Sequence, residues 1–176
     1  RAETARVFGE HGACVLVTDV NDAQGETVAK EITDLGGGAS YMHLDTSQEE
    51  QWKRVFPETV SRYGRIDILQ NNVGVSSRQK LEDITEEEWD EHFRINLSSM
   101  VMAAQAIVPF MEKVGGGSII NLSSIAAVRA YPADRTGYTT SKAAAIGLTV
   151  SLAAQLGNRL IRVNAIAPGQ VYTPLV

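Results

Sequence analysis

Short apolar runs alternate along the chain with longer segments in which apolar residues recur every three or four positions. Runs rich in Val, Ile and Leu are typical of buried β-strands, and the wider spacing indicates α-helices. We expect strands at 14–20, 39–44, 66–69, 118–122 and 161–166. We expect helices at 1–10, 21–35, 47–63, 85–113 and 138–156.

Several helix ends carry recognisable signals. Asn21 is a predicted N-cap, and Ser47–Glu50 and Thr85–Glu88 both match the capping box, in which the first and fourth residues exchange hydrogen bonds. The acidic run of Thr85–Glu88 therefore indicates a helix start that complements the helix dipole, not a metal site. The helix 85–113 is expected to break near Asn96.

This alternation predicts an α/β fold with a doubly wound parallel sheet, Rossmann-like and three-layered (α/β/α). Because no linker interrupts the pattern, we expect a single domain over residues 1–176. In such sheets ligands bind beyond the carboxyl ends of the strands. Polar or turn-forming residues follow the predicted strands at Asp19, Asp45, Asn71–Gly74, Ser123–Ser124 and Pro168–Gly169.

Composition narrows the function classes. The net charge of −5 and pI near 5.2 give no footprint for nucleic acid, and no apolar run reaches membrane-spanning length. The single cysteine, Cys14, cannot form an internal disulfide, which favours a reducing compartment and a cytoplasmic location. Cys14 opens an apolar run, so a buried structural thiol is expected. The three histidines show no ligand spacing, so we expect no metal site.

Tyr138 and Lys142 stand four residues apart at the start of a predicted helix, so their side chains share one face. A cation beside a phenol favours its ionised form and lowers its pKa. Such a phenol can exchange a proton with a substrate oxygen near neutral pH. Taken alone, the spacing more often reflects an exposed Lys above a half-buried Tyr than a catalytic pair.

The ordered set of polar residues resembles the short-chain dehydrogenase/reductase family over the whole chain. The resemblance rests on Asn71-Asn72-Val73-Gly74, Asn96, Ser124, Tyr138, Lys142 and Pro168-Gly169 with Thr173. Val73 departs from the Ala usual in the family. The resemblance implies an oxidoreductase that transfers hydride between a nicotinamide cofactor and a secondary alcohol or ketone.

The resemblance also implies roles for four catalytic residues. Tyr138 would exchange the proton with the substrate oxygen, and Lys142 would lower the Tyr138 pKa and bind the nicotinamide ribose. Ser124 would hold the substrate oxygen. It matches the family better than Ser123, and successive strand residues face opposite sides, so only one serine can face the site. Asn96 would bend its helix and hold a relay water.

Asp19 ends the strand at which the family binds the adenosine ribose, where a carboxylate can bond the ribose hydroxyls of NAD. It would repel the extra phosphate of NADP, and neither Val20 nor Asn21 supplies a positive charge. NAD is therefore expected over NADP. By resemblance, further cofactor contacts are expected from Asp45 (adenine), Asn72 and Gly74 (adenosine side), Pro168, Gly169, and Val171 and Thr173 (carboxamide).

The family's glycine-rich loop would lie before the first residue, so we expect a chain truncated at both ends and a poor binder of cofactor by itself. The triplets 36–38 and 115–117 precede strands and are predicted turns, not substitutes for that loop. In the 3-2-1-4-5-6 order the strand preceding this chain is central. The strands 14–20 and 66–69 should then lack the neighbour between them.

The sequence also suggests subunit partners, a substrate pocket and alternative functions. The helical segments Ser99–Phe110 and Ala143–Leu156 are apolar nearly all round, which favours a homodimer or homotetramer. Segments 75–83 and 128–135 are expected to line a pocket for a small alcohol or carbonyl compound. The alternatives are an NADPH-dependent carbonyl reductase of the same fold, a catalytically silent cofactor-binding regulatory protein, and a methyltransferase, in which Tyr138 and Lys142 would be idle.

Overall fold

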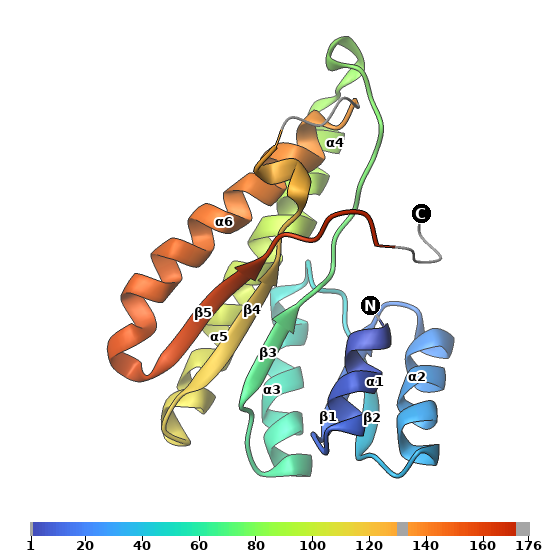
Figure 1. Cartoon of the computed structure of the whole chain (residues 1–176), viewed down its shortest axis with the longest axis vertical. Coiled ribbons are helices and arrows are strands. Elements are labelled where there is room, and N and C mark those ends of the chain that lie inside the picture. Colours follow the sequence, from blue (N-terminus) through green and yellow to red (C-terminus); the bar gives the residue numbers. More distant parts are fainter. Residues whose placement is uncertain (1, 130–133, 172–176) are drawn as a thin grey trace. The chain divides into compact units, whose positions relative to one another are not determined.

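The computed structural model describes residues 2–129 and 134–171, in which strands and helices alternate (Figure 1). The strands are β1 (Val15–Asp19), β2 (Ala39–His43), β3 (Ile68–Asn71), β4 (Gly117–Leu122) and β5 (Ile161–Ile166). The helices are α1 (Ala2–Glu10), α2 (Asp22–Asp34), α3 (Glu49–Tyr63), α4 (Glu86–Phe93), α5 (Ser99–Lys113) and α6 (Thr136–Leu156). The chain forms two compact units, residues 1–65 and 66–176, which are described separately.

The first unit contains β1 and β2, which pair in parallel with Val17 opposite Tyr41. Neighbouring strand residues face opposite sides of a sheet. The ring of Tyr41 lies against Gly25 of α2, whereas the Ser40 hydroxyl accepts a 2.7 Å hydrogen bond from Tyr63 of α3. Helices α2 and α3 therefore cover opposite faces of this sheet, which gives three layers within the unit.

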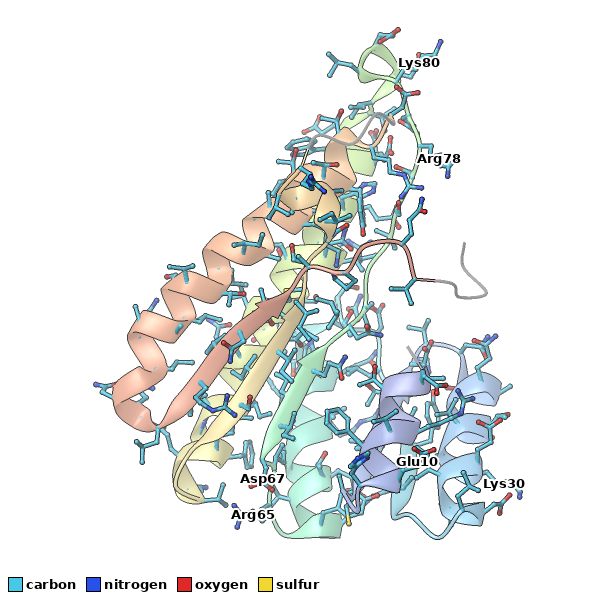
Figure 2. The ribbon with its side chains drawn as sticks, viewed as in Figure 1. Glu10, Lys30, Arg65, Asp67, Arg78 and Lys80 are labelled. Atoms are coloured by element: carbon cyan, nitrogen blue, oxygen red, sulfur yellow. The ribbon has the colours of Figure 1, made fainter. Side chains whose placement is uncertain are left out.

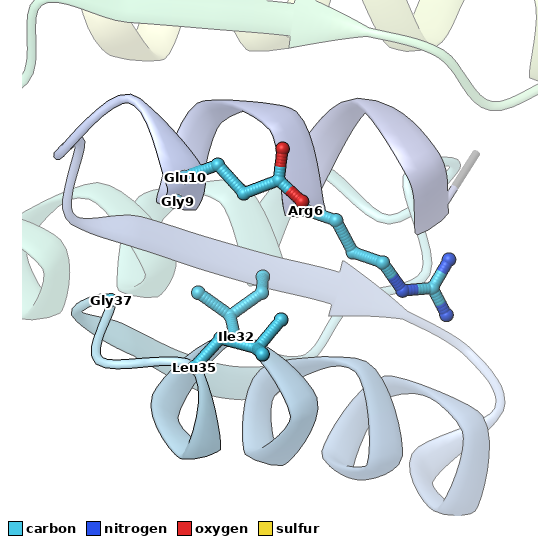
Figure 3. A pocket seen from close by; sticks show the side chains of 6 residues that line it. All are labelled: Arg6, Gly9, Glu10, Ile32, Leu35 and Gly37. Atoms are coloured by element: carbon cyan, nitrogen blue, oxygen red, sulfur yellow. The ribbon is translucent and has the colours of Figure 1, made fainter.

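Helices α1 and α2 pack closely in the same unit. A Cβ on Gly9 would stand 2.4 Å from Ile32 Cγ2, and Arg6 forms a 2.6 Å ion pair with Glu31. A hollow beside this contact holds about 200 Å³, solvent at its mouth included, and is lined by Arg6, Gly9, Glu10, Ile32, Leu35 and Gly37 (Figure 3). Ligand pockets usually measure about 300–1,000 Å³, so this hollow does not suit a nucleotide.

The second unit is built on a parallel sheet of order β3-β4-β5. Helices α5 and α6 both contact β4 and β5. In β5, buried Ile161 and Val163 alternate with exposed Arg162 and Asn164, so one face of this strand is covered. The fully buried core residues of the unit include Ala103, Ile107, Met111, Ile119 and Ala145.

The predicted α/β fold with parallel strands and flanking helices is confirmed. Within residues 2–65, β1 pairs only with β2, and within the described part of the second unit β3 pairs only with β4. The Asn21 cap is confirmed, since its side chain accepts a hydrogen bond from Gln24 N. The Thr85 cap is also confirmed by a bond from Glu88 N. The expected helix break is a π-helical turn, η2 (Arg94–Ser98), between α4 and α5.

The structure corrects two expected boundaries and one expected burial. The Ser47–Glu50 capping box is wrong, because the Ser47 hydroxyl donates to Asp45 Oδ1 at 2.7 Å and α3 begins at Glu49. The third strand lies at Ile68–Asn71 instead of 66–69, because pairing with β4 begins at Ile68.

Cys14 and β1 were expected to be buried, but Cys14 is exposed and every β1 residue is only half-buried. A continuous apolar run implies cover on every side. Among the described residues, β1 has a strand neighbour on one edge alone.

Candidate active site

The π-helical turn places Asn96 entirely inside the second unit. Asn96 is 0% exposed, and its amide accepts from Val75 N at 2.8 Å and donates to Val75 O at 3.0 Å. It also donates to the Ser141 hydroxyl at 2.9 Å. A π-turn widens a helix locally and is frequent at functional sites. Here it joins the segment after β3 to helix α6 through one amide side chain.

The first turns of α6 carry Tyr138, Ser141 and Lys142. The Ser141 hydroxyl accepts the bond from Asn96 and donates to Tyr138 O at 2.9 Å. Lys142 is 4% exposed, and its Nζ donates to Leu122 O at the end of β4 at 2.7 Å. A buried ammonium group requires such partners, since its charge has lost water. The bonds fix the start of α6 against both β4 and the π-turn.

The two serines that follow β4 have different partners. Ser123 Oγ donates to the backbone carbonyl of Lys142 at 2.7 Å, so this hydroxyl holds α6 against the end of β4. Ser124 Oγ accepts from Ala126 N at 3.2 Å, in the short turn η3 (Ile125–Ala127). Among the described residues, no acceptor takes the Ser124 hydroxyl proton. The two hydroxyls therefore differ in what they hold, and the role of Ser124 stays a prediction.

Gly74 lies where a side chain would be crowded. A Cβ at this position would stand 3.1 Å from both Asn96 Oδ1 and Lys142 Nζ. The backbone of Gly74 therefore approaches both polar groups closely. Asn72, two residues earlier, is half-buried directly after β3. The structure thus brings Gly74, Asn96 and Lys142 together.

Tyr138 is half-buried, and the guanidinium carbon of Arg135 lies 6.0 Å from its ring centroid. Arg135 also pairs with Gln79 in an isolated bridge, and Gln79 N donates to Asp134 O at 2.9 Å. The two segments expected to line the pocket therefore lie side by side at this point. Residues 130–133 fall outside the described residues.

A polar cluster anchors the long connection between β3 and α4, which carries Arg78 and Lys80 (Figure 2). The Ser77 hydroxyl contacts Glu88 Oε1 and lies 3.4 Å from His92 Nε2, and His92 is 1% exposed. The other imidazole nitrogen, Nδ1, lies 2.8 Å from Glu88 O. No sequence motif connects these three residues.

The segment after β5 lies beside the serines. Ser123 N donates to Ile166 O at 2.8 Å, and Ile125 N donates to Pro168 O at 2.9 Å. Gly169 and Val171, further along this segment, are exposed. Thr173 was expected to contact the cofactor and lies outside the described residues.

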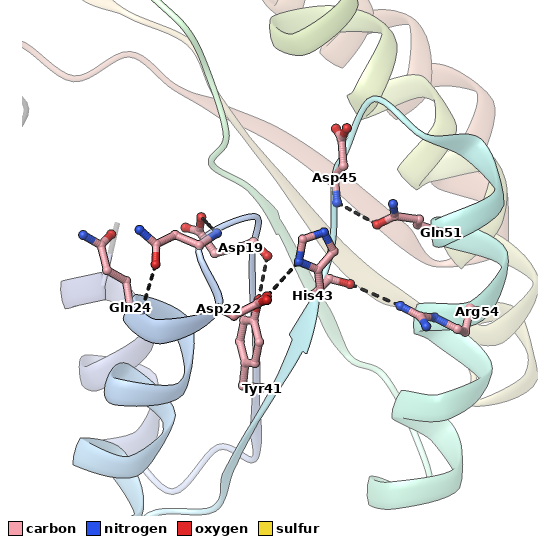
Figure 4. Close-up of polar contacts among 9 residues, drawn as sticks. Asp19, Asp22, Gln24, Tyr41, His43, Asp45, Gln51 and Arg54 are labelled. Carbon is pink, nitrogen blue, oxygen red and sulfur yellow. Dashed lines mark hydrogen bonds and ion pairs between the residues drawn. The ribbon is translucent and has the colours of Figure 1, made fainter.

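The remaining expected cofactor residues, Asp19 and Asp45, belong to the first unit (Figure 4). Asp19 ends β1 and is half-buried, and its Oδ1 accepts from Asn21 N at 3.0 Å. Asp45 follows β2, and its Oδ1 accepts from both Ser47 N and Ser47 Oγ. Both carboxylates are thus held by local backbone.

Sequence reasoning missed a second buried chain of hydrogen bonds in the second unit. Asn71 Nδ2 donates to Asn121 Oδ1 at 2.8 Å, and Asn121 Nδ2 donates to Thr149 Oγ1 at 3.0 Å. The available signal was a polar residue, Asn121, inside an otherwise apolar strand. In the described part of the chain no cluster of His, Cys, Asp and Glu could hold a metal ion, and no helix is long and apolar enough to cross a membrane.

The α/β fold and the order of the polar residues are typical of nicotinamide-dependent oxidoreductases. Comparison with known proteins points to the same class of enzyme. The family model described as short chain dehydrogenase matches residues 2–176. The chain is 37% identical to the 3-oxoacyl-[acyl-carrier-protein] reductase of Thermotoga maritima, over 98% of this chain and 70% of the relative. It is 38% identical to a 3-alpha-(or 20-beta)-hydroxysteroid dehydrogenase of Mycobacterium bovis, over 99% of this chain and 65% of the relative.

Solved structures give the same result. A short-chain type dehydrogenase/reductase from Mycobacterium marinum superposes with a TM-score of 0.92 at 32% identity, covering 96% of this chain and 69% of that one. A 7 alpha-hydroxysteroid dehydrogenase complexed with NADH and 7-oxo glycochenodeoxycholic acid superposes with a TM-score of 0.89 at 35% identity, covering 98% and 70%. The chain belongs to the short-chain dehydrogenase family, whose members are NAD(P)-dependent oxidoreductases acting on CH–OH groups. It spans about two thirds of the length of these curated relatives, 65–70%.

Proposed function

We propose that the protein interconverts a secondary alcohol and a ketone, with Tyr138 exchanging the proton of the substrate oxygen. The observation that carries the proposal is a chain of hydrogen bonds from Asn96 through the Ser141 hydroxyl to the backbone carbonyl of Tyr138. Lys142 is buried one turn further along α6. Three buried or half-buried polar residues at the start of α6, with a buried Asn against them, are costly for a protein that does not use them.

The chemistry divides among the residues of this site. Tyr138 is half-buried, so its hydroxyl can meet a ligand while its ring stays packed. Ser124, whose proton has no described acceptor, can donate a hydrogen bond to the substrate oxygen. The Asn96 amide is fully occupied by Val75 and Ser141, so it acts by holding α6 and the segment after β3.

The donor set fits a nicotinamide cofactor, which when bound supplies or accepts the hydride. The fit rests on Gly74, where a Cβ would fill the space beside Lys142 Nζ and leave no room for a ligand's hydroxyl groups. We assign Lys142 to the nicotinamide ribose. The other proposed cofactor residues are Asp19, Asp45, Asn72, Gly74, Tyr138, Pro168, Gly169, Val171 and Thr173.

We further propose NAD over NADP. Asp19 presents a carboxylate at the end of β1, and it is followed by Val20 and Asn21, which carry no positive charge. A carboxylate can accept bonds from two ribose hydroxyls and repels a 2′-phosphate. The alternative, NADPH-dependent carbonyl reduction, would give the higher kcat/KM with NADPH. This comparison on the natural full-length protein decides between them.

The proton-transfer proposal is tested by Tyr138→Phe in the natural full-length protein. Loss of general acid–base catalysis should lower kcat by about 10²–10⁴-fold, while the Kd for NADH changes by less than about twofold. The matched control is Tyr63→Phe, which removes a tyrosine hydroxyl from the first unit and should leave kcat unchanged. Activity of Tyr138→Phe equal to that of the natural protein would overturn the mechanism. NADH binding with no turnover in the unaltered protein would support the silent regulatory alternative.

We also propose a homodimer or homotetramer formed through the Ser99–Phe110 and Ala143–Leu156 segments. On α6, Val150 is 66% exposed, and Ala143, Gly147 and Ala154 are exposed as well. A row of small and apolar residues allows two helices to pack closely. Sedimentation of the natural full-length protein as a monomer would remove this proposal.

A further inference from the structure

The turn that presents the Asp19 carboxylate joins β1 to α2 through Val20 and Asn21. Within the turn, Asn21 N donates to Asp19 Oδ1 at 3.0 Å, and the Asn21 side chain caps α2. One bond comes from outside the turn, since Leu44 N donates to Asp19 O at 3.1 Å beside the last β1–β2 pair. That bond holds the end of β1 but not Val20, Asn21 or Asp22, and short exposed turns with few bonds open readily. A contact that spans the turn would hold it, and with it the Asp19 carboxylate, in one direction.

Tyr41 of β2 provides that contact (Figure 4). Its hydroxyl oxygen lies 2.9 Å from Asp19 O and 2.5 Å from Asp22 Oδ1. The hydroxyl has one proton, which these two acceptors, on the first and the last residue of the turn, share. Since Asp22 is also the first residue of α2, the contact joins the end of β1 to the start of that helix.

The ring of Tyr41 is itself held in place. A Cβ on Gly25 of α2 would stand 2.1 Å from Tyr41 Cε2, so the ring fills the space that a side chain there would occupy. Rigid packing of this kind fixes where the hydroxyl points, because a tyrosine has only two side-chain torsions. The position of the turn therefore depends on Tyr41 and not on the turn alone.

His43 completes the arrangement. Its Nδ1 lies 2.7 Å from Asp22 Oδ1, the oxygen that Tyr41 also contacts. Hydrogen bonds from Tyr41 and then His43 lower the pKa of Asp22, so it is an anion at neutral pH and accepts both bonds. Burial and the Asp22 carboxylate raise the pKa of Tyr41, so the phenol keeps the proton it donates.

We propose that Tyr41 and Asp22 are positioning residues for cofactor recognition, which hold the Asp19 carboxylate toward the adenosine ribose. The inference rests on the ribose-binding role proposed for Asp19. Among the described residues no donor binds Asp19 Oδ2, which leaves that oxygen for a ribose hydroxyl. Tyr41 and Asp22 need not touch the cofactor, because they act through the backbone that carries Asp19.

The test compares steady-state kinetics of Tyr41→Phe, Asp22→Asn and Asp19→Ala in the natural full-length protein. Loss of one hydrogen bond of the usual net strength should raise the KM for NAD by about 3- to 10-fold in Tyr41→Phe, with kcat changed less than about twofold. Tyr63→Phe is the matched control, since its hydroxyl bonds Ser40 on the other face of the sheet. It should leave the KM for NAD unchanged.

The decisive step is the double variant Tyr41→Phe with Asp19→Ala. If Tyr41 acts through Asp19, removing its hydroxyl should have no further effect on the KM once Asp19 is gone. Additive effects of the two changes, or a KM for Tyr41→Phe equal to that of Tyr63→Phe, would overturn the inference. If Tyr41→Phe folds poorly, the KM for NAD of Asp22→Asn tests the same contact with the Tyr41 ring retained.

The two proposals can fail separately. If Asp19→Ala leaves the KM for NAD unchanged, the ribose-binding role of Asp19 is wrong and the positioning inference falls with it. If Asp19→Ala raises the KM while Tyr41→Phe and Asp22→Asn do not, Asp19 keeps its role and only the positioning inference is wrong.

Discussion

The two units hold their polar groups in opposite ways. In the second unit the bonds made by the side chains of Asn96 and Asn121 join only uncharged groups, and Asn96, Asn121 and Ser141 are all 0% exposed. In the first unit the Tyr41 cluster is charged and open to solvent, since the side chains of Asp22 and His43 are 63% and 45% exposed. The comparison separates polar groups that stabilise a core from polar groups that direct a surface turn.

The difference follows from the cost of an unmade hydrogen bond. A buried amide that loses its partner cannot form a hydrogen bond with water instead, so the free energy of unfolding falls by the full desolvation penalty. An exposed carboxylate that loses its partner is hydrated at once, and salt screens its charge. Changes to the buried Asn121 network should therefore appear mainly in unfolding, and changes to the exposed Tyr41 cluster mainly in cofactor binding.

The largest effect is expected from Asn121→Leu in β4. It leaves Asn71 Nδ2 and Thr149 Oγ1 without their partner, at a cost of about 2–4 kcal/mol in the free energy of unfolding. Denaturant unfolding of the natural full-length protein measures this. Adding Asn71→Leu should cost less than the sum of the two single changes, because both partners are then apolar. A single-variant cost below about 0.5 kcal/mol would contradict the view that this network stabilises the core.

Gly25→Ala should have the next largest effect, because the new methyl group would overlap the Tyr41 ring. Overpacking of this kind costs about 1–3 kcal/mol, and it should also raise the KM for NAD by moving Tyr41. The matched control is Gly157→Ala directly after α6, where φ is −59° and nothing lies within 4 Å of the added carbon. That change should stabilise the protein by about 0.4–1 kcal/mol. Equal signs for the two variants would show that the ring does not need Gly25.

These contrasts also show what the sequence could and could not predict. The Asn21 and Thr85 caps were correct because each bond joins residues three apart. The Ser47 cap failed although its pattern was the same, because Asp45 Oδ1 accepts the Ser47 N–H that a capping box gives to its fourth residue, and α3 begins only at Glu49. A local motif is thus a sound prediction only when no nearby acceptor is stronger.

In the candidate site, too, some residues could be predicted from the sequence and others could not. The resemblance selected Asn96, Tyr138 and Lys142, and the structure brings the segments that carry them together. Their support was not predicted, since Asn71 and Asn121 are 50 residues apart and Tyr41 and Asp22 are 19 apart. Burial of Cys14 was predicted wrongly for a related reason, because exposure depends on which neighbours a strand has. Contacts between distant residues exist only once the fold has brought their elements together.

Acid should affect the Tyr41 cluster in a defined direction. The folded-state pKa of Asp22 is lowered from 3.8, so its carboxylate stabilises the fold above that value and stops doing so as the pH falls through the lower folded value. The urea midpoints of the natural protein and Asp22→Asn should therefore differ at neutral pH and converge under acid. A difference that persists or grows on acidification would mean that the carboxylate is not held by Tyr41 and His43.

The smallest effect is expected from Lys30→Met in α2. The Lys30–Asp34 pair is as short as 2.5 Å, but the two side chains are 73% and 61% exposed. An exposed pair at i and i+4 contributes about 0.3–0.5 kcal/mol at most, and added salt should remove even that. Arg6→Met is the matched comparison, since Arg6 contacts Glu31 through both Nε and Nη2 and its side chain is only 31% exposed. Its cost should be larger and less sensitive to salt, because burial, and not distance, decides how much an ion pair stabilises the first unit.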